Sequence, residues 1–228
     1  MPISRTDADA AAGLETARLL LDIKAVNFRP EEPYTLTSGW ASPVYIDCRW
    51  VISFPEARSR IIQLGCEKLD REIGFDAIDA VAGGETAGIP YAAWIAEARA
   101  KPMLYVRKKP KGFGRDAQIE GTFKEGEKVL LVEDLTTDGG SKIGFVDALR
   151  KAGGEVTDIF VVFFYGAFPG AEETLNKMGV NLHYLANWQD VLKVAEEGQY
   201  FNQAANDGVR AFLDDPVSWS KDHGGRGE

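Results

Sequence analysis

Two adjacent carboxylates, Glu133 and Asp134, follow four apolar residues (129–132) that are typical of a buried strand. Small and polar residues come next at 136–141, and a helical pattern begins at about Ile143. Backbone N–H groups in such a loop, with a helix N-terminus behind them, can bind a phosphate. The carboxylates suit the vicinal hydroxyls of a sugar, because a carboxylate accepts the hydrogen bonds that hydroxyls donate.

A phosphate site and a diol site at the end of one strand together describe a site for a ribose 5-phosphate. Ligands of open parallel sheets bind beyond the carboxyl ends of the strands, which is where these residues fall. The alternative is an ordinary strand, turn and helix with two acids on the surface. We favour the ligand site because the apolar run, the acid pair and the small-residue loop occur together.

A second glycine-rich segment, residues 83–88 with the sequence Gly-Gly-Glu-Thr-Ala-Gly, follows a short strand predicted over 77–82. An Ala-rich helix is predicted after it, over 89–100. If this segment lies beside the first loop, its backbone amides form a second anion site. The alternative is a tight turn without a ligand.

A cluster of cations follows the strand predicted over 103–107, although the chain as a whole is acidic. Five cations lie within nine residues: Arg107, Lys108, Lys109, Lys111 and Arg115. One proline and two glycines in the same stretch indicate a mobile loop rather than a helix face. A mobile cationic loop suits a pyrophosphate, which carries several negative charges. The alternative is a solvated charged surface.

Composition limits the remaining possibilities. The chain has 228 residues, of which 45% are hydrophobic, enough for one sizeable core. A net charge of −9 argues against nucleic-acid and membrane-surface binding. Two cysteines and two histidines are too few for a disulfide framework, a zinc site or a histidine-based triad, and they fit a reducing cytoplasm. We find neither a signal-peptide pattern nor an apolar run long enough to span a membrane.

Strands predicted over 77–82, 103–107, 128–133, 156–164 and 180–186 alternate with helices. This order predicts an α/β fold with a doubly wound, mostly parallel sheet. We expect a single domain over 1–228, with a small N-terminal hood over about 10–50, a core over about 51–200 and a frayed tail over about 214–228.

Local patterns refine this outline. The hood should begin with a helix over 10–26 and continue as one hairpin, in which Tyr34 and Leu36 face Val44 and Ile46 across a Ser-Gly turn. A capping box at Ser53 should start the next helix. Asn187 should cap the helix that follows the last strand. We expect His183, within that strand, to be a packed residue rather than a ligand.

Several of these segments resemble the phosphoribosyltransferases. Residues 129–142 resemble that family's signature for 5-phosphoribosyl 1-diphosphate (PRPP). Residues 34–49, with the pattern T-L-x-S-G…S-P-x-Y, resemble the hood of orotate phosphoribosyltransferases, which covers the base. Residues 107–114 are similar to the R-K-x-x-K-x-H-G catalytic loop of the same family. The resemblance extends over about residues 14–195 and implies the type I phosphoribosyltransferase fold.

The implied reaction joins orotate to PRPP and yields orotidine 5′-monophosphate and pyrophosphate, a step of pyrimidine (UMP) biosynthesis. The implied catalytic residues are Arg107, Lys111 and Asp134. The implied PRPP-binding residues are Arg107, Lys108, Lys111, Glu133, Asp134, Leu135, Thr136, Thr137, Asp138, Gly139, Gly140 and Ser141. The implied orotate-binding residues are Tyr45, Ile46 and Thr137, and the implied pyrophosphate loop is Glu85, Thr86, Ala87 and Gly88.

The resemblance also implies a Mg²⁺ cofactor, held mainly through PRPP oxygens rather than by a set of protein ligands. It implies a homodimer in which each subunit's catalytic loop reaches the neighbouring site. Four positions depart from the family pattern. Thr37 and Ala87 stand where many members carry lysine, Phe113 stands where histidine is usual, and no arginine follows the strand at 156–164. These departures keep two alternatives open: a phosphoribosyltransferase for another base, and a non-catalytic PRPP-sensing regulator.

Overall fold

The computed structural model describes residues 5–36, 38–110, 118–137 and 139–227. Its centre is a six-stranded sheet in the order β10-β9-β8-β5-β6-β7. The strands are β5 (Ala80–Gly84), β6 (Met103–Val106), β7 (Ile119–Glu120), β8 (Val129–Thr136), β9 (Asp158–Phe164) and β10 (Asn181–Asn187). All neighbours are parallel except β6 and β7. The predicted doubly wound, mostly parallel sheet is therefore confirmed.

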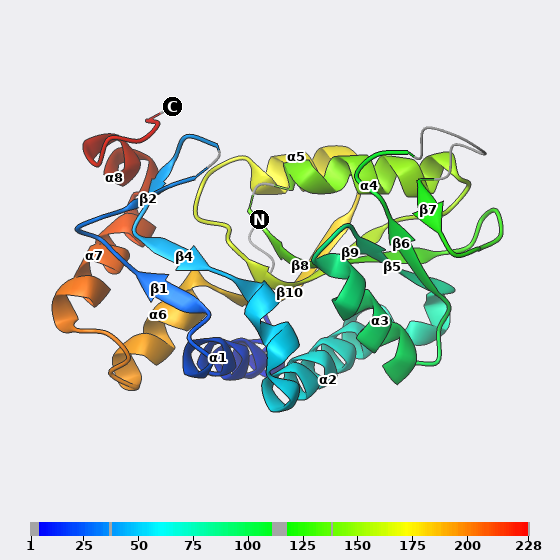
Figure 1. Cartoon of the computed structure of the whole chain (residues 1–228), viewed down its shortest axis with the longest axis horizontal. Helices are drawn as coiled ribbons and strands as arrows, with labels where there is room; N and C mark the ends of the chain where they lie inside the picture. The colour runs from blue at the N-terminus through cyan, green and yellow to red at the C-terminus, as the bar shows by residue number, and fades with distance from the viewer. Residues whose placement is uncertain (1–4, 37, 111–117, 138, 228) are drawn as a thin grey trace.

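Helices cover both faces of this sheet (Figure 1). One face carries α1 (Asp7–Asp22), α2 (Pro55–Glu72) and α3 (Gly88–Ala98), and the other carries α4 (Gly140–Lys151) and α5 (Ala171–Met178). Because side chains alternate along a strand, Leu130 and Val132 of β8 enter one core while Val129 and Leu131 enter the other. Burial on both faces explains the continuous apolar run that precedes the two acids.

The winding of the sheet reverses between β5 and β8. After β5 the chain crosses to β6 on one side, and it then returns to place β8 on the other side of β5. At such a reversal the two following loops separate and leave a crevice beyond the strand ends. Residues 133–137 and 84–88 therefore lie beside the same crevice.

The hood differs from its prediction. Strand β2 (Tyr34–Thr35) pairs with β3 (Ala41–Ser42), whereas β4 (Val44–Ile46) pairs with β1 (Val26–Phe28). The predicted single hairpin that joins residues 34–36 to residues 44–46 is wrong. Pro43 separates the two pairings because it has no N–H group for a ladder, and its carbonyl accepts the N–H of Arg29 instead.

Several helix boundaries are also corrected. Helix α1 runs over 7–22 rather than 10–26, because Thr6 and Asp9 form a capping box at its start. The capping box expected at Ser53 is wrong, since Ser53 ends the 3₁₀ helix η1 (Cys48–Ser53) and Phe54 precedes α2 without a side-chain cap. Asn187 caps α6 (Trp188–Glu197) as predicted.

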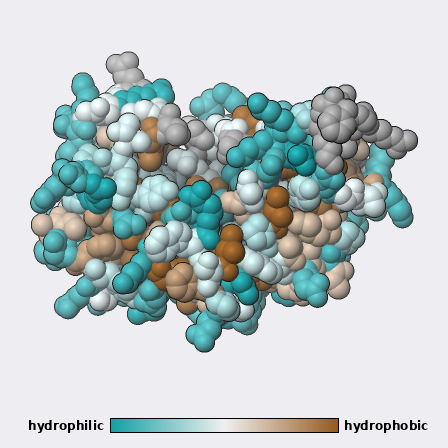
Figure 2. All heavy atoms as spheres, viewed as in Figure 1, coloured by the Kyte–Doolittle hydropathy of each residue, from teal (hydrophilic) through white to brown (hydrophobic). Residues whose placement is uncertain are grey.

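The predicted frayed tail is wrong for the residues up to 227. Helices α7 (Gln203–Asp214) and α8 (Pro216–Asp222) follow α6, and α8 packs beside the hood (Figure 1). Trp219 is buried in this contact and Ser220 is fully enclosed. Across the described parts of the chain, no helix is both long and apolar enough to cross a membrane. The face drawn in Figure 2 is mostly hydrophilic, with small hydrophobic patches near its middle.

Candidate active site

A cavity of about 870 Å³ lies between the hood and the carboxyl ends of β5 and β8. It is large enough for a nucleotide-sized ligand. Ten of the residues predicted for the site line it: Tyr45, Ile46, Glu85, Thr86, Ala87, Lys108, Glu133, Asp134, Leu135 and Thr137. The structure thus brings the acid pair, the glycine-rich turn and the hood together, as expected from the switch point of the sheet.

Glu133 points to the α4 side of β8 and forms a buried ion pair with Lys142. The Lys142 Nζ to Glu133 Oε2 distance is 2.8 Å. The other oxygen, Oε1, is buried and accepts no hydrogen bond from the described residues. Burial raises the pKa of Glu133 to about 7, and the attraction of Lys142 only partly opposes this shift. Glu133 therefore lines the cavity with one carboxylate oxygen that lacks a hydrogen-bond donor among the described residues.

Asp134 points to the opposite face of β8, because successive side chains of a strand alternate. It is 7% exposed and interacts electrostatically with Arg49 of η1. Burial raises the pKa of Asp134, while the backbone N–H of Leu135 lowers it. The two acids line one cavity from the two sides of the strand end, so together they can accept hydrogen bonds from two neighbouring hydroxyls.

Three glycines let the turn after β5 approach Glu133. A Cβ on Gly84 would lie 1.8 Å from Glu133 Oε1, and one on Gly88 would lie 2.4 Å from the Val132 carbonyl oxygen. A Cβ on Gly83 would lie 2.7 Å from the Gly88 carbonyl oxygen. Glycine is required here for close contact between strands and helix rather than for an unusual backbone angle.

The start of the cationic segment is fixed to this turn. Glu85 accepts the backbone N–H of Lys108 at 2.7 Å, and Lys108 lines the cavity. Arg107 does not line it: its guanidinium lies 3.5 Å from Glu120, and its backbone N–H and carbonyl both bond to Gln118. The structure thus does not bring Arg107 to the described cavity. Lys111 lies outside the described residues.

The residues of the predicted phosphate loop have different positions: some line the cavity, one belongs to β8, and others form the start of α4. Leu135 and Thr137 line the cavity, whereas Thr136 is buried within β8, which extends further than the predicted 128–133. Gly139 adopts a φ of 76° that suits glycine, and Gly140 begins α4 earlier than expected. Asp138 and the side chain of Ser141 lie outside the described parts. The start of α4 therefore stands directly behind this loop, as phosphate binding requires.

Sequence reasoning missed four functional candidates. Lys142, Arg49 and Tyr165 line the cavity, and the Tyr165 hydroxyl is hydrogen-bonded to Ser42 of the hood. Lys142 lies four and seven positions before Val146 and Leu149, so it falls on the same buried face of α4. A buried lysine needs a carboxylate partner. This helical spacing could have predicted the ion pair of Lys142 with Glu133. No local sequence pattern predicts the contacts of Arg49, Tyr165 or Ser42.

Arg49 is held by Asp47. Its Nε lies 2.6 Å from Asp47 Oδ1, and its Nη2 lies 2.7 Å from Oδ2. This two-point contact orients the guanidinium on the hood side of the cavity. Both residues line the cavity beside Tyr45 and Ile46. Arg49 thus gives the hood side of the cavity a cation, although this chain lacks the family's lysines at positions 37 and 87 and its arginine after the strand at 156–164.

Comparisons with known proteins agree with this geometry. No protein-family model matches the chain. The orotate phosphoribosyltransferase of Ruegeria sp. (strain TM1040) is 53% identical over 97% of both chains. The crystal structure of orotate phosphoribosyltransferase from Aeropyrum pernix is 30% identical with a TM-score of 0.67, over 81% of this chain and 99% of that one. A Mycobacterium tuberculosis orotate phosphoribosyltransferase, solved with PRPP, is 26% identical with a TM-score of 0.61, over 79% and 98% of the chains.

Sheet, hood and switch-point cavity together define an enzyme with the type I phosphoribosyltransferase fold. Within that class, the identity and coverage of the relatives decide the assignment. The chain belongs to the orotate phosphoribosyltransferase family.

Proposed function

We propose that this enzyme transfers the 5-phosphoribosyl group from PRPP to orotate and thereby produces orotidine 5′-monophosphate for pyrimidine biosynthesis. A bond forms between a ring nitrogen of orotate and ribose C1′ while the bond from C1′ to the diphosphate oxygen breaks. The diphosphate leaves with the bonding electrons, so C1′ becomes positively charged in the transition state. Orotate is already an anion, so the protein mainly has to position the reactants and stabilise charge.

The observation that carries the proposal is the pair of buried carboxylates at the end of β8. Asp134 and the free Oε1 of Glu133 accept the two ribose hydroxyls, and their negative charge lies near the developing charge on C1′. The loop from Thr137 to Gly140 and the start of α4 receive the 5-phosphate. Lys108, held by Glu85, faces the diphosphate.

The donor set fits a Mg²⁺ ion that is shared with the substrate. In the part of the chain that the structure describes, no three His, Cys, Asp or Glu side chains form a metal-binding group. Mg²⁺ usually takes one or two carboxylates together with substrate phosphates and water. Asp134 is the carboxylate that could contribute a ligand, and the ion would neutralise charge on the leaving diphosphate.

On the hood side we assign the orotate carboxylate to Arg49, with the base against Tyr45 and Ile46. Arg49→Gln should raise the KM for orotate by about tenfold or more, because a charge-assisted hydrogen bond contributes about 1.5–3 kcal/mol. The KM for PRPP should change little. Arg58→Gln, a change of a partly exposed arginine of α2 outside the cavity lining, is the matched control. Equal orotate KM values in the two variants would favour another base or another anchor.

We further propose a cytoplasmic homodimer in which the segment containing Lys111 serves the partner's site. The two cysteines are free and buried, which fits a reducing compartment. Mixing inactive Lys111→Ala and Asp134→Asn proteins tests the shared loop, since some mixed dimers would contain one intact site. Partial recovery of activity is expected. No recovery after verified subunit exchange would place Lys111 in its own subunit's site.

Ultraviolet absorbance assays of orotate consumption with PRPP and Mg²⁺ test the central proposal. Rapid turnover that depends on both substrates supports it. Turnover of another base in place of orotate would support the first alternative. Tight PRPP binding in calorimetry without turnover of any base would support a PRPP-sensing regulator, and both of these results would overturn the proposal.

A further inference from the structure

The hood hairpin of β2 and β3 is too small to hold its own position. Among the described residues its ladder consists of two residue pairs, and it is not part of the central sheet. A two-stranded hairpin of this size is at best marginally stable in water. Four of its residues, Tyr34, Thr35, Leu36 and Ser38, nevertheless line the cavity. Some other part of the chain must therefore fix the hairpin against the cavity.

The C-terminal segment, residues 215–227, makes that contact through Ser220. The Ser220 hydroxyl accepts the backbone N–H of Ala41 at 2.9 Å and donates to the Arg226 carbonyl at 2.7 Å. The Arg226 N–H in turn donates to the Gly39 carbonyl at 2.8 Å. Ser220 is fully buried, so these bonds are shielded from competing water. The hydroxyl thus ties both the hairpin and the end of the chain to α8.

The C-terminal segment also packs closely against the β2–β3 hairpin. A Cβ on Gly225 would lie 2.3 Å from the Ala41 nitrogen, so the segment crosses directly over β3. Ring contacts continue inward from Trp219 to Phe212, then to Phe168, and finally to Trp40 of the hairpin, with centroids 5.4, 5.6 and 4.6 Å apart. Figure 1 shows α8 and β2 together at the edge of the hood.

We propose that the C-terminal segment is a strut for the hood and that Ser220 is a positioning residue for orotate, because it holds the hairpin where the hairpin lines the base side of the cavity. This inference rests on the proposed function. The PRPP groups are assigned to β8, α4 and the turn after β5, whereas α8 packs mainly against β3 and α7 in the described part of the chain. Loss of the strut should therefore affect the two substrates unequally.

Kinetics of Ser220→Ala test this asymmetry. The KM for orotate should rise by about fivefold or more, since the variant loses one hydrogen bond to the hairpin and one within the strut. The KM for PRPP should stay within about twofold. Ser59→Ala, the same change on the exposed face of α2, should match wild type in both.

Hydrogen exchange provides an independent readout. Amides of residues 34–42 should exchange faster in Ser220→Ala, while those of β8 should not. Equal increases in both KM values, or an unchanged KM for orotate, would overturn the proposal. A wild-type enzyme that does not turn over orotate would instead count against the proposed function, so the two failures are distinguishable.

Discussion

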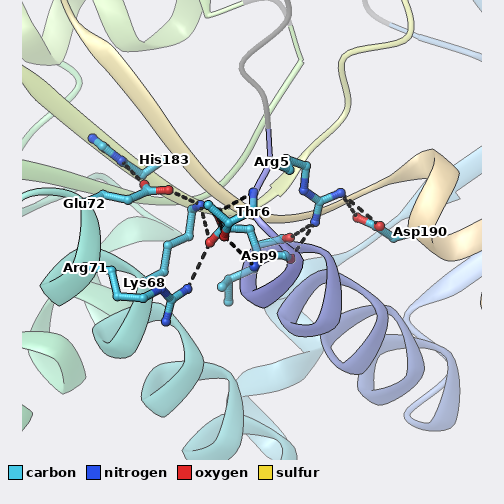
Figure 3. A network of polar contacts seen from close by, with 9 residues as sticks. Arg5, Thr6, Asp9, Lys68, Arg71, Glu72, His183 and Asp190 are labelled. Atoms are coloured by element: carbon cyan, nitrogen blue, oxygen red, sulfur yellow. Dashed lines mark hydrogen bonds and ion pairs between the residues drawn. The ribbon is translucent and has the colours of Figure 1, made fainter.

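Two groups of charged residues, each built around buried carboxylates, have opposite properties in this molecule. The N-terminal charge network joins α1, α2, β9, β10 and α6 and consists of Arg5, Asp9, Lys68, Arg71, Glu72, Asp158, His183 and Asp190, most of which Figure 3 shows. The site carboxylates are Glu133 and Asp134. Asp9, Lys68, His183 and Asp190 of the network are buried, as are both site carboxylates, so burial alone does not separate the two groups.

They differ in how completely their carboxylates are bonded. Asp9 accepts hydrogen bonds from the Thr6 hydroxyl and N–H and from Arg71, and lies 3.1 Å from the Lys68 nitrogen. Although burial alone would raise it, these partners lower the pKa of Asp9 well below its ordinary value. Glu133 has Lys142 on one oxygen only, and its pKa rises. A carboxylate whose oxygens are all hydrogen-bonded stabilises the fold, whereas one with an unbonded oxygen can still bind a ligand.

The largest effect is expected from a change in the N-terminal charge network, where the carboxylate of Asp9 is fully hydrogen-bonded. Asp9→Asn removes the charge between Lys68 and Arg71 and should lower the free energy of unfolding by about 3–5 kcal/mol. The kcat of the folded protein should stay near that of wild type. Urea denaturation and assays below the unfolding range measure both quantities. A stable but inactive variant would contradict the division of roles.

The corresponding substitution of a site carboxylate should lower activity and leave stability intact. Asp134→Asn should lower kcat/KM by about 100-fold, because an amide offers one acceptor oxygen instead of two and loses charge-assisted bonds of about 1.5–3 kcal/mol each. Stability should stay equal or increase, since burial already disfavours the charged form of Asp134. Wild-type turnover by this variant would refute the ribose assignment.

The pair of Glu133 and Lys142 provides a sharper comparison. Activity should rise with pH as Glu133 ionises near its pKa of about 7. Lys142→Met removes the attraction that lowers this pKa, so the rising limb of kcat/KM for PRPP should move to higher pH by about one unit. Glu133→Gln should abolish the limb. If the limb stays in place in Lys142→Met, another group controls it.

Much of the fold could be predicted from sequence because local patterns determine it. The apolar runs that become β8 and β9 are buried on both faces, and the acid pair marks the carboxyl end of β8. Their alternation with helices predicted the parallel sheet, but the strand order that brings residues 133–137 and 84–88 to one crevice is known only from the structure. The Asn187 cap was predicted for the same reason, since its partner lies three residues away.

The remaining features depend on contacts between distant residues. Ser220 meets Ala41 across 179 positions, so no pattern within 214–228 distinguishes a strut from a frayed end. The pairing of β4 with β1 instead of β2 likewise depends on tertiary packing around Pro43. The salt bridge of Arg107 with Glu120 shows that a cation within a matching motif can serve the fold.

The smallest expected effect concerns pH and the N-terminal charge network. His183 bonds to Asp158 through Nε2 at 2.8 Å and to Glu72 through Nδ1 at 2.5 Å. Burial alone would lower the pKa of His183, but the two carboxylates outweigh it and raise the pKa above 6.5. The same contact contributes to lowering the pKa of Asp158 from 3.8 to about 2, against the opposing effect of burial.

The stabilisation by His183 is therefore complete below pH 6.5 and is lost as the pH rises through the raised pKa, whereas that by Asp158 is present above pH 3.8 and is lost as the pH falls through about 2. Urea denaturation at several pH values should show that His183→Gln costs about 1 kcal/mol more at pH 5.5 than at pH 9. If His183→Gln costs the same at both pH values, His183 is neutral in the folded protein. Its contacts with Asp158 and Glu72 then do not depend on protonation.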